Sequence, residues 1–223
     1  MKSYYTILFI IIAIAEIFCI AMTFRSKRKI ADILRVAFCW ALVPIIANVI
    51  LTHTENMNVA NFAYSLFFGS INWVIYYMLR FCTEYTAFPL KAQKVFRPVL
   101  KTMLTLDSIS MILNLVIKHA FSTYPVITDH EEVYFHTVKY LFYNAHLVFA
   151  YILSAMILGV LIWKVATTPA LYWRRYFIVI AIMVFLLGTD ALFVFTQKVI
   201  DLSILSFAFG SYLLCYVALI YKP

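Results

Sequence analysis

Charged residues and glycine are scarce in this chain. Only 13% of its 223 residues are Asp, Glu, Lys or Arg, and it contains four glycines. A water-soluble domain of this length exposes far more charge, so the composition argues against a soluble fold. So few glycines also leave no glycine-rich loop to cradle a phosphate, and the sequence contains neither a P-loop motif nor GxGxxG.

Hydrolase motifs and paired cysteines are absent as well. The sequence contains no GxSxG, HExxH or GxGD, and we therefore expect no catalytic residue in this chain. The cysteines lie in or at the ends of apolar segments, and no CxxC occurs, so neither a disulfide nor a zinc framework is predicted. They are Cys19, Cys39, Cys82 and Cys215.

One polar segment, residues 118–139, contains several side chains that bind metals in other proteins. They are Asp129, His130, Glu131, Glu132 and His136. A metal site needs three or four convergent ligands, and the spacing here matches no known zinc motif. We interpret the segment as a solvated polar loop and predict neither a metal nor a cofactor.

Long hydrophobic runs are what the sequence does have. Hydrophobic residues make up 65% of the chain, and its mean hydropathy is +0.93. A helix needs about 20 mostly apolar residues to cross a bilayer. Such runs predict an all-α polytopic membrane protein, a single seven-helix bundle over residues 1–223. The expected spans are residues 4–24, 33–53, 61–81, 99–117, 140–163, 176–196 and 202–221.

Basic residues predict the orientation of these spans. If the N-terminus lies outside the cell, 14 of the 18 Lys and Arg residues fall in cytoplasmic segments. Cytoplasmic loops are enriched in Lys and Arg, which favours an outside N-terminus and a cytoplasmic C-terminus in the cell membrane. The net charge of +8 then reflects topology and is no nucleic-acid footprint. Basic residues 25–29 follow the first apolar run, which argues against its being a cleaved signal peptide.

Polar residues within the spans are the candidate site. Ionisable groups in a membrane are costly and usually face the bundle interior. We predict an outward-facing ligand pocket above an inner polar latch formed by Glu16 and Asp107. The candidate ligand-binding residues are Asn48, Asn72, Asn114, His146, Asp190 and Ser206.

The alternative is that these groups only form hydrogen bonds between helices. Small and polar side chains recur on one face of several spans, such as Ser65, Gly69 and Asn72 in the third. Such faces are common at helix–helix interfaces, so packing is the preferred interpretation for Ser, Asn and Gly. For Asp107 and Asp190 both interpretations stay open, because packing rarely needs a carboxylate.

Three well-known seven-helix classes do not match. The last span has no lysine that could bind retinal, and it has no NPxxY motif. The third span ends Leu79-Arg80-Phe81 rather than in the acidic-Arg-Tyr triplet of G-protein-coupled receptors. Transporters with two inverted repeats of three helices carry a Pro-Gln pair in each half, and this chain contains none.

Two segments resemble another class. Residues 73–87, WVIYYMLRFCTEYTA, and residues 212–222, YLLCYVALIYK, resemble the bacterial seven-transmembrane N-terminal sensor region of histidine kinases and diguanylate cyclases. The resemblance implies a sensor that binds an extracytoplasmic or membrane-borne ligand, with a possible homodimer. It also implies a kinase or GGDEF output module in cis, beyond Pro223.

The seventh span is the expected carrier of the signal, because it leads to the C-terminus. Ser203, Ser206 and Gly210 share one face there, and small residues allow a neighbouring helix to approach and slide. Two further classes stay open. One is a small transporter or channel lined by Glu16, Asp107 and Asp190, and the other is a membrane enzyme with an unfamiliar site.

Overall fold

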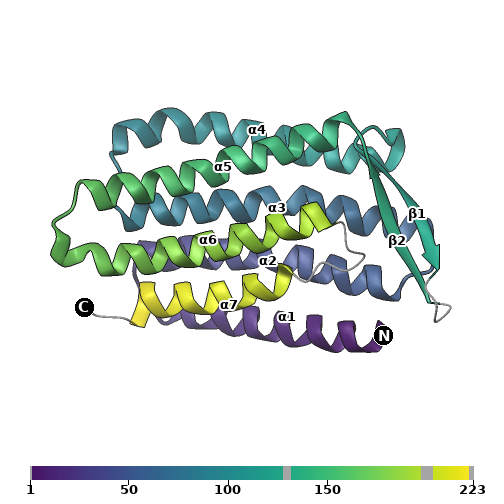
Figure 1. Ribbon diagram of the computed structural model, residues 1–223, viewed down its shortest axis with the longest axis horizontal. Coiled ribbons are helices and arrows are strands. Elements are labelled where there is room, and N and C mark those ends of the chain that lie inside the picture. Colours follow the sequence, from purple (N-terminus) through teal and green to yellow (C-terminus); the bar gives the residue numbers. More distant parts are fainter. Residues whose placement is uncertain (1, 128–131, 197–202, 221–223) are drawn as a thin grey trace.

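The computed structural model describes residues 2–127, 132–196 and 203–220, and it is dominated by long helices (Figure 1). The connection before α6 contains a short 3₁₀ helix, η1 (Ala170–Tyr172), and α7 continues as a π-helical turn, η2 (Tyr216–Ile220). The helices are α1 (Lys2–Phe24), α2 (Lys29–His53), α3 (Met57–Tyr85), α4 (Leu90–Ile117), α5 (Leu141–Ala166), α6 (Trp173–Thr196) and α7 (Ser203–Cys215).

Six helical segments of the described chain are long and apolar enough to cross a membrane. They are α1 to α5 and the segment Ala170–Phe193, which contains η1 and most of α6. The chain is thus a largely helical, multi-pass membrane protein, as predicted. The seventh predicted span corresponds to α7 with η2, which is apolar but shorter than the others.

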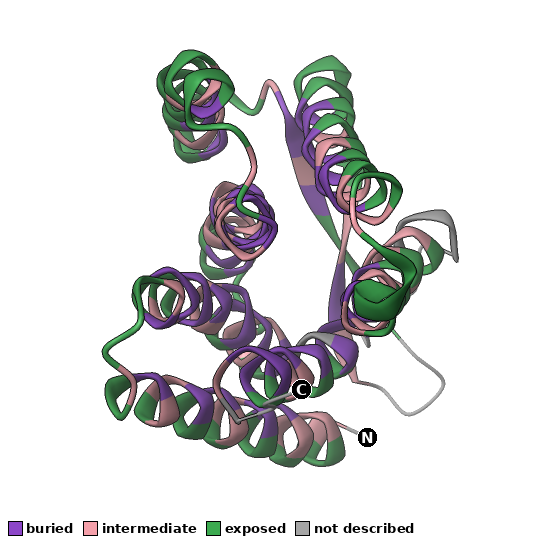
Figure 2. Cartoon of the chain, turned by 90° about the vertical axis from the view of Figure 1, so that its left-hand side faces the viewer, coloured by how far each residue is buried: buried purple, intermediate pink, exposed green. Residues whose placement is uncertain are grey.

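The helices lie side by side along the long axis (Figure 1), and buried residues gather on the sides where neighbouring helices meet (Figure 2). Helix α3 is the most deeply buried of the candidate spans. It packs against α2, α4 and α5, and 67% of its most apolar stretch is buried, against 22% for α4. Helix α7 packs between α1 and α6. Helix α4, by contrast, makes its main contacts with α3 alone.

Two prolines lie within helices. Pro44 lies in α2, where the buried Asn48 donates from Nδ2 to the Pro44 carbonyl at 2.9 Å. Asn48 thus bonds its own helix rather than lining a pocket. Pro98 lies inside α4, because that helix begins at Leu90, nine residues before the predicted span. The polar turns at the start of α4 have no hydropathy signal, which explains the misplaced boundary.

A β-hairpin replaces the predicted polar loop between α4 and α5. Its strands, β1 (Phe121–Ile127) and β2 (Val133–Lys139), pair antiparallel with Thr123 opposite Thr137. The hairpin lies across one end of the bundle (Figure 1), and Phe121 is fully buried. The Tyr64 hydroxyl of α3 donates to the Phe135 carbonyl at 2.6 Å and fixes the hairpin to the helices.

Asn114 joins the hairpin to the end of α4. Its side-chain oxygen accepts from the backbone N–H groups of Ala120 (2.8 Å) and Phe121 (3.2 Å), and its Nδ2 donates to the Phe121 carbonyl at 2.9 Å. Asn114 is 2% exposed, and the three backbone groups have no access to water at this position. Asn114 therefore fixes the start of the hairpin to the end of α4 and does not serve as a ligand contact.

Replacing Asn114 by alanine is expected to destabilise the hairpin locally by roughly 2–3 kcal/mol, because three buried backbone groups lose their partner. Amide hydrogen exchange at Ala120 and Phe121 should accelerate, while exchange in α3 stays slow. Asn58→Ala is the control, because the Asn58 side chain is exposed. Equal protection of the hairpin in Asn114→Ala and Asn58→Ala would contradict the role of Asn114.

Candidate functional site

Three predicted site residues from three helices meet inside the bundle. Asn72 of α3 donates from Nδ2 to Asp107 Oδ2 of α4 at 2.9 Å. His146 of α5 places Nδ1 2.9 Å from the same oxygen and 3.0 Å from Asp107 Oδ1. Asn72 is fully buried and His146 is 4% exposed. We call Asn72, Asp107 and His146 the polar centre.

Hydrogen-bonding chemistry limits how the polar centre is arranged. An ionised carboxylate only accepts, so a proton must lie between Asp107 and His146 Nδ1 for these atoms to approach to 2.9 Å. The Asn72 amide must present its NH₂ group, because its oxygen would repel Asp107. The Asn72 oxygen is then left buried without a hydrogen-bond partner among the described residues. The centre is therefore a carboxyl group joined by hydrogen bonds to Asn72 and His146, and Asn72 Nδ2 also lies 3.0 Å from His146 Nδ1.

A second polar contact supports the same helix pair. The Trp73 indole N–H donates to Ser108 Oγ at 2.8 Å, and Ser108 Oγ donates to the Gly69 carbonyl at 2.9 Å. The Phe68 ring lies edge-on to the His146 ring, with centroids 6.0 Å apart. Because α4 buries few apolar side chains, these polar contacts contribute much of its attachment to α3.

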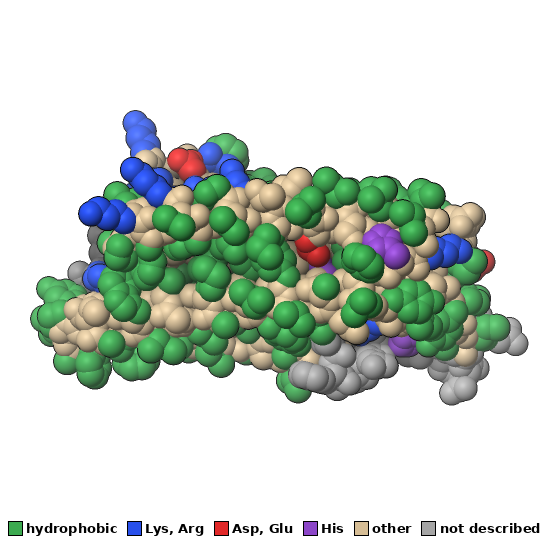
Figure 3. All heavy atoms as spheres, turned by 90° about the horizontal axis from the view of Figure 1, so that it is seen from above, with side chains coloured by type: hydrophobic (Ala, Val, Ile, Leu, Met, Phe, Trp, Pro, Cys, Tyr) green, Lys and Arg blue, Asp and Glu red, His purple; other side chains and the backbone are tan. Residues whose placement is uncertain are grey.

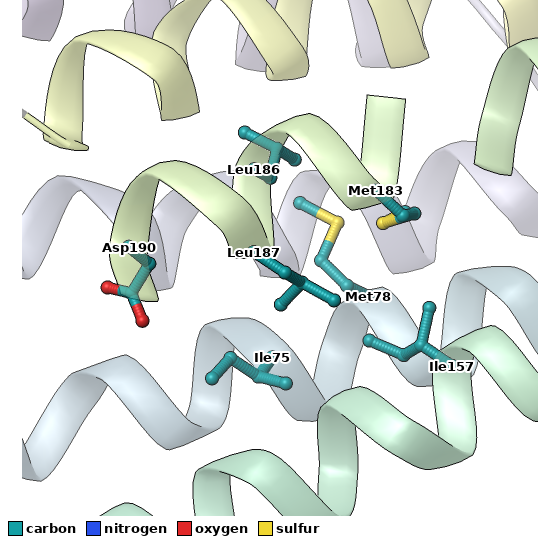
Figure 4. Close-up of a pocket in the computed structure, with 7 residues that line it drawn as sticks. All are labelled: Ile75, Met78, Ile157, Met183, Leu186, Leu187 and Asp190. Atoms are coloured by element: carbon teal, nitrogen blue, oxygen red, sulfur yellow. The ribbon is translucent and has the colours of Figure 1, made fainter. Parts of the chain in front are cut away.

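A groove lies beside the polar centre, between α3, α5 and α6 (Figure 4). It encloses about 340 Å³ of empty space, part of it open to the surroundings. Figure 4 shows Asp190 at one end, and Ile157 and Met183 at the other. The lining residues are Ile75, Met78, Ile157, Met183, Leu186, Leu187 and Asp190.

Asp190 is the polar end of this groove. Its carboxylate interacts electrostatically with His146 and with Tyr151 of α5. No donor from the described part of the chain lies within hydrogen-bonding distance of it. The groove and the polar centre are therefore neighbouring parts of one region, and its acidic group is open to an external donor.

Leu186 connects the groove to α7. It is buried, lines the groove from α6, and lies directly over Gly210. A Cβ built on Gly210 would lie only 2.6 Å from Leu186 Cδ2. Thr189, the residue before Asp190 in α6, forms a hydrogen bond with Ser206 of α7. Both contacts hold α6 against α7 immediately next to Asp190.

Glu16 forms a separate polar contact between α1 and α7. Its Oε1 accepts from Ser211 Oγ at 3.0 Å, and the residue is fully buried. Its second oxygen has no partner among the described residues. Glu16 and Asp107 therefore do not form the single inner latch predicted. The prediction estimated the depth of each residue in the membrane from approximate span ends, which places a residue only to within one or two helical turns. Depth also does not reveal which neighbouring helix a residue faces.

The predicted residues thus separate into two groups. The structure brings Asn72, Asp107 and His146 into contact, and Asp190 lies in the lining of the neighbouring groove. Asn48 and Asn114 instead form hydrogen bonds with backbone groups, and Ser206 forms one with Thr189 of α6. The Ser206 hydroxyl also donates to the Ser203 carbonyl. For these residues the packing alternative fits the geometry.

Sequence reasoning missed Leu186, Thr189 and Ser211. Leu186 has no chemical signal in a hydrophobic helix, and only its position over Gly210 distinguishes it. Ser211 could have been found, since it follows the predicted small-residue face by one position.

The outer face agrees with a membrane setting (Figure 3). Hydrophobic side chains are spread along the whole visible face, and most of the visible basic side chains gather at its upper left. Acidic and histidine atoms also show towards the middle and right of this face. The Asp107 side chain is 11% exposed, so the polar centre reaches the surface.

The hairpin does not supply a metal site in its described part. No group of three His, Cys, Asp or Glu side chains suited to a metal occurs among the residues the structure describes. Asp129, His130 and Glu131 lie outside those residues. Burial, together with the positive charge of Lys139, lowers the pKa of His136 in β2.

Comparison with known proteins gives no family: the chain matches no protein-family model and no curated protein. Its function is therefore argued from the polar centre, the groove and the contact between α6 and α7.

Proposed function

We propose that the chain is a membrane-embedded signal-input domain of the cell membrane. A ligand binds in the groove between α3, α5 and α6, and the resulting change passes through α7 to a cytoplasmic output module beyond Pro223. The module is a diguanylate cyclase or histidine kinase, on the resemblance of residues 73–87 and 212–222 to sensor regions of those proteins. The bundle has seven spans, with α7 and η2 forming the last.

The position of Leu186 supports this proposal most directly. Leu186 is among the residues that line the groove, and its side chain, which Figure 4 shows directed away from Ile75, lies over the glycine of α7. A ligand that displaces Leu186 must therefore change the packing of α6 on α7. Signalling requires two packings of the bundle between which the ligand discriminates, and a leucine over a glycine is a contact with little room for intermediate positions.

Labelling of introduced cysteines tests the proposed orientation. In a Cys39→Ser background, a membrane-impermeant thiol reagent should label Tyr124→Cys in intact cells but not Lys94→Cys. Tyr124 lies exposed in the hairpin, and Lys94 lies exposed at the basic end of α4. Labelling at Lys94→Cys without labelling at Tyr124→Cys would show the opposite orientation.

Filling the groove tests signal transmission. Leu187→Trp should occupy the groove as a ligand would, and shift the distance between spin labels at Tyr216 on η2 and Lys91 on α4. Both label sites are exposed, and the exposed Cys39 is replaced by serine. The distance distribution in lipid nanodiscs is measured by pulsed electron paramagnetic resonance.

The matched control is Leu192→Trp, which adds the same side chain on the outer face of α6, where Leu192 is 64% exposed. It should leave the distance distribution unchanged. Identical distributions in wild type, Leu187→Trp and Leu192→Trp would mean that the groove does not communicate with α7.

A further inference from the structure

We propose that the groove binds a membrane-borne, single-chain amphiphile with a cationic amine head group. The amine pairs with Asp190, and the alkyl chain lies along α6 towards Met183. This assignment rests on the proposed function, because it names the chemical class of the ligand for the same groove.

The head group follows from the chemistry of Asp190. It is the one carboxylate in a lining that is otherwise made of aliphatic and methionine side chains. No donor from the described residues reaches it, and a carboxylate without a partner in a low-dielectric setting is unfavourable. An ammonium group supplies both the charge and the hydrogen bonds, whereas a phosphate or fatty-acid carboxylate would be repelled.

The tail follows from the shape and composition of the groove. Its space of about 340 Å³ between atoms includes room that is open to the surroundings, so the groove is a shallow, open channel rather than an enclosed pocket. An open, narrow channel suits a single alkyl chain lying along α6 rather than the two chains of a phospholipid. Met78 and Met183 line it, and their unbranched side chains adapt to chains of different length.

The route of entry points to the bilayer rather than to water. Tyr151 of α5, which interacts electrostatically with Asp190, is 39% exposed, and the neighbouring Ile152 is 50% exposed. On α6, Val184, three residues before the groove-lining Leu187, is 51% exposed. A ligand already dissolved among lipid chains can approach Asp190 past these apolar side chains without crossing the bundle.

Photolabelling tests the ligand class directly. The protein in lipid nanodiscs is irradiated with a diazirine derivative of dodecylamine, and labelled peptides are identified by mass spectrometry. We expect labels on the α3, α5 and α6 segments that line the groove, and protection by excess dodecylamine. The matched diazirine derivative of dodecanol, which lacks the charge, should label the groove at least about tenfold more weakly.

Two variants complete the test. Asp190→Asn keeps the side-chain size and should reduce amine labelling of the groove to the level of the alcohol. Leu187→Trp should block labelling by both probes, whereas Leu192→Trp should not. Equal labelling by amine and alcohol, or undiminished amine labelling in a folded Asp190→Asn protein, would overturn the assignment. Labelling confined to lipid-facing surfaces would do the same.

The outcome of the labelling test can be distinguished from the outcome of the test of the proposed function. If Leu187→Trp shifts α7 but the amine probe labels no groove peptide, the ligand class is wrong and the signalling role stands. If the amine labels the groove but α7 does not respond to Leu187→Trp, the ligand class stands and the signalling role is wrong.

Discussion

Replacing His146 by leucine is expected to lower the free energy of unfolding by about 3 kcal/mol, because the largely buried Asp107 loses its main hydrogen-bond partner. Only Asn72 then remains to hold the carboxylate. Asn72→Leu should have a smaller effect, about 1 kcal/mol, since single interhelical hydrogen bonds in membranes contribute modestly. Unfolding in mixed micelles, followed by titration with a denaturing detergent, measures both values.

A double substitution distinguishes a paired carboxylate from general packing. Asp107→Leu with His146→Leu removes both partners, and replacing both members of a buried pair by apolar groups is often close to neutral. The double variant should therefore be more stable than His146→Leu alone. Leu106→Ala, at a position 62% exposed on α4, is the control for changes on the lipid face. Strictly additive losses in the double variant would show that Asp107 and His146 do not act as a pair.

Gly210→Leu is expected to fix the packing of α6 on α7 and to abolish the response of α7 to groove filling. Even a Cβ at this position would approach Leu186 Cδ2 to 2.6 Å, so Leu186 must rotate or the helices must separate. Overpacking of this kind destabilises by roughly 1–3 kcal/mol. The distance between labels at Tyr216 and Lys91 should no longer change when Leu187→Trp is added.

Gly188→Leu provides the matched control, because nothing lies within 4 Å of a Cβ built on Gly188 in α6. It should leave the response of α7 intact. Leu186→Ala makes room beside Gly210 and should restore the response in Gly210→Leu. A Gly210→Leu protein that inserts normally and keeps the full response would exclude this contact as the route of the signal, whereas lower stability alone would indicate a packing role.

The positions of the helices were predictable, because hydropathy over 20 residues is a strong signal. The residues at which the helices begin and end were not predictable. Residues 90–98 continue α4 although they are polar, since backbone hydrogen bonding extends a helix beyond the apolar run. The hairpin was missed for a different reason. Its strands have seven residues each, and Pro125 interrupts the alternation of β1.

The face of each polar residue was predictable, but its partner was not. Spacing along α3 correctly put Ser65 and Asn72 on a buried face. Periodicity within one helix contains no information about which neighbour faces it, so the meeting of Asn72 with Asp107 and His146 required the three-dimensional arrangement. The same limit hid Leu186, whose importance comes from a glycine that follows it by 24 positions along the chain.

The attachment of α4 mainly to α3, partly through polar contacts, has a consequence for biosynthesis. An aspartate near the middle of a helix opposes insertion by about 2.5–3.5 kcal/mol on scales from translocon experiments. When α4 leaves the ribosome, α3 has already been made and offers Asn72 as a first donor to Asp107. His146 lies 39 residues later, on a helix that has not yet emerged from the ribosome. Stable insertion of α4 therefore waits for α5 to enter the membrane. In nascent chains that stop before α5, the carboxyl group of Asp107 lacks its His146 partner.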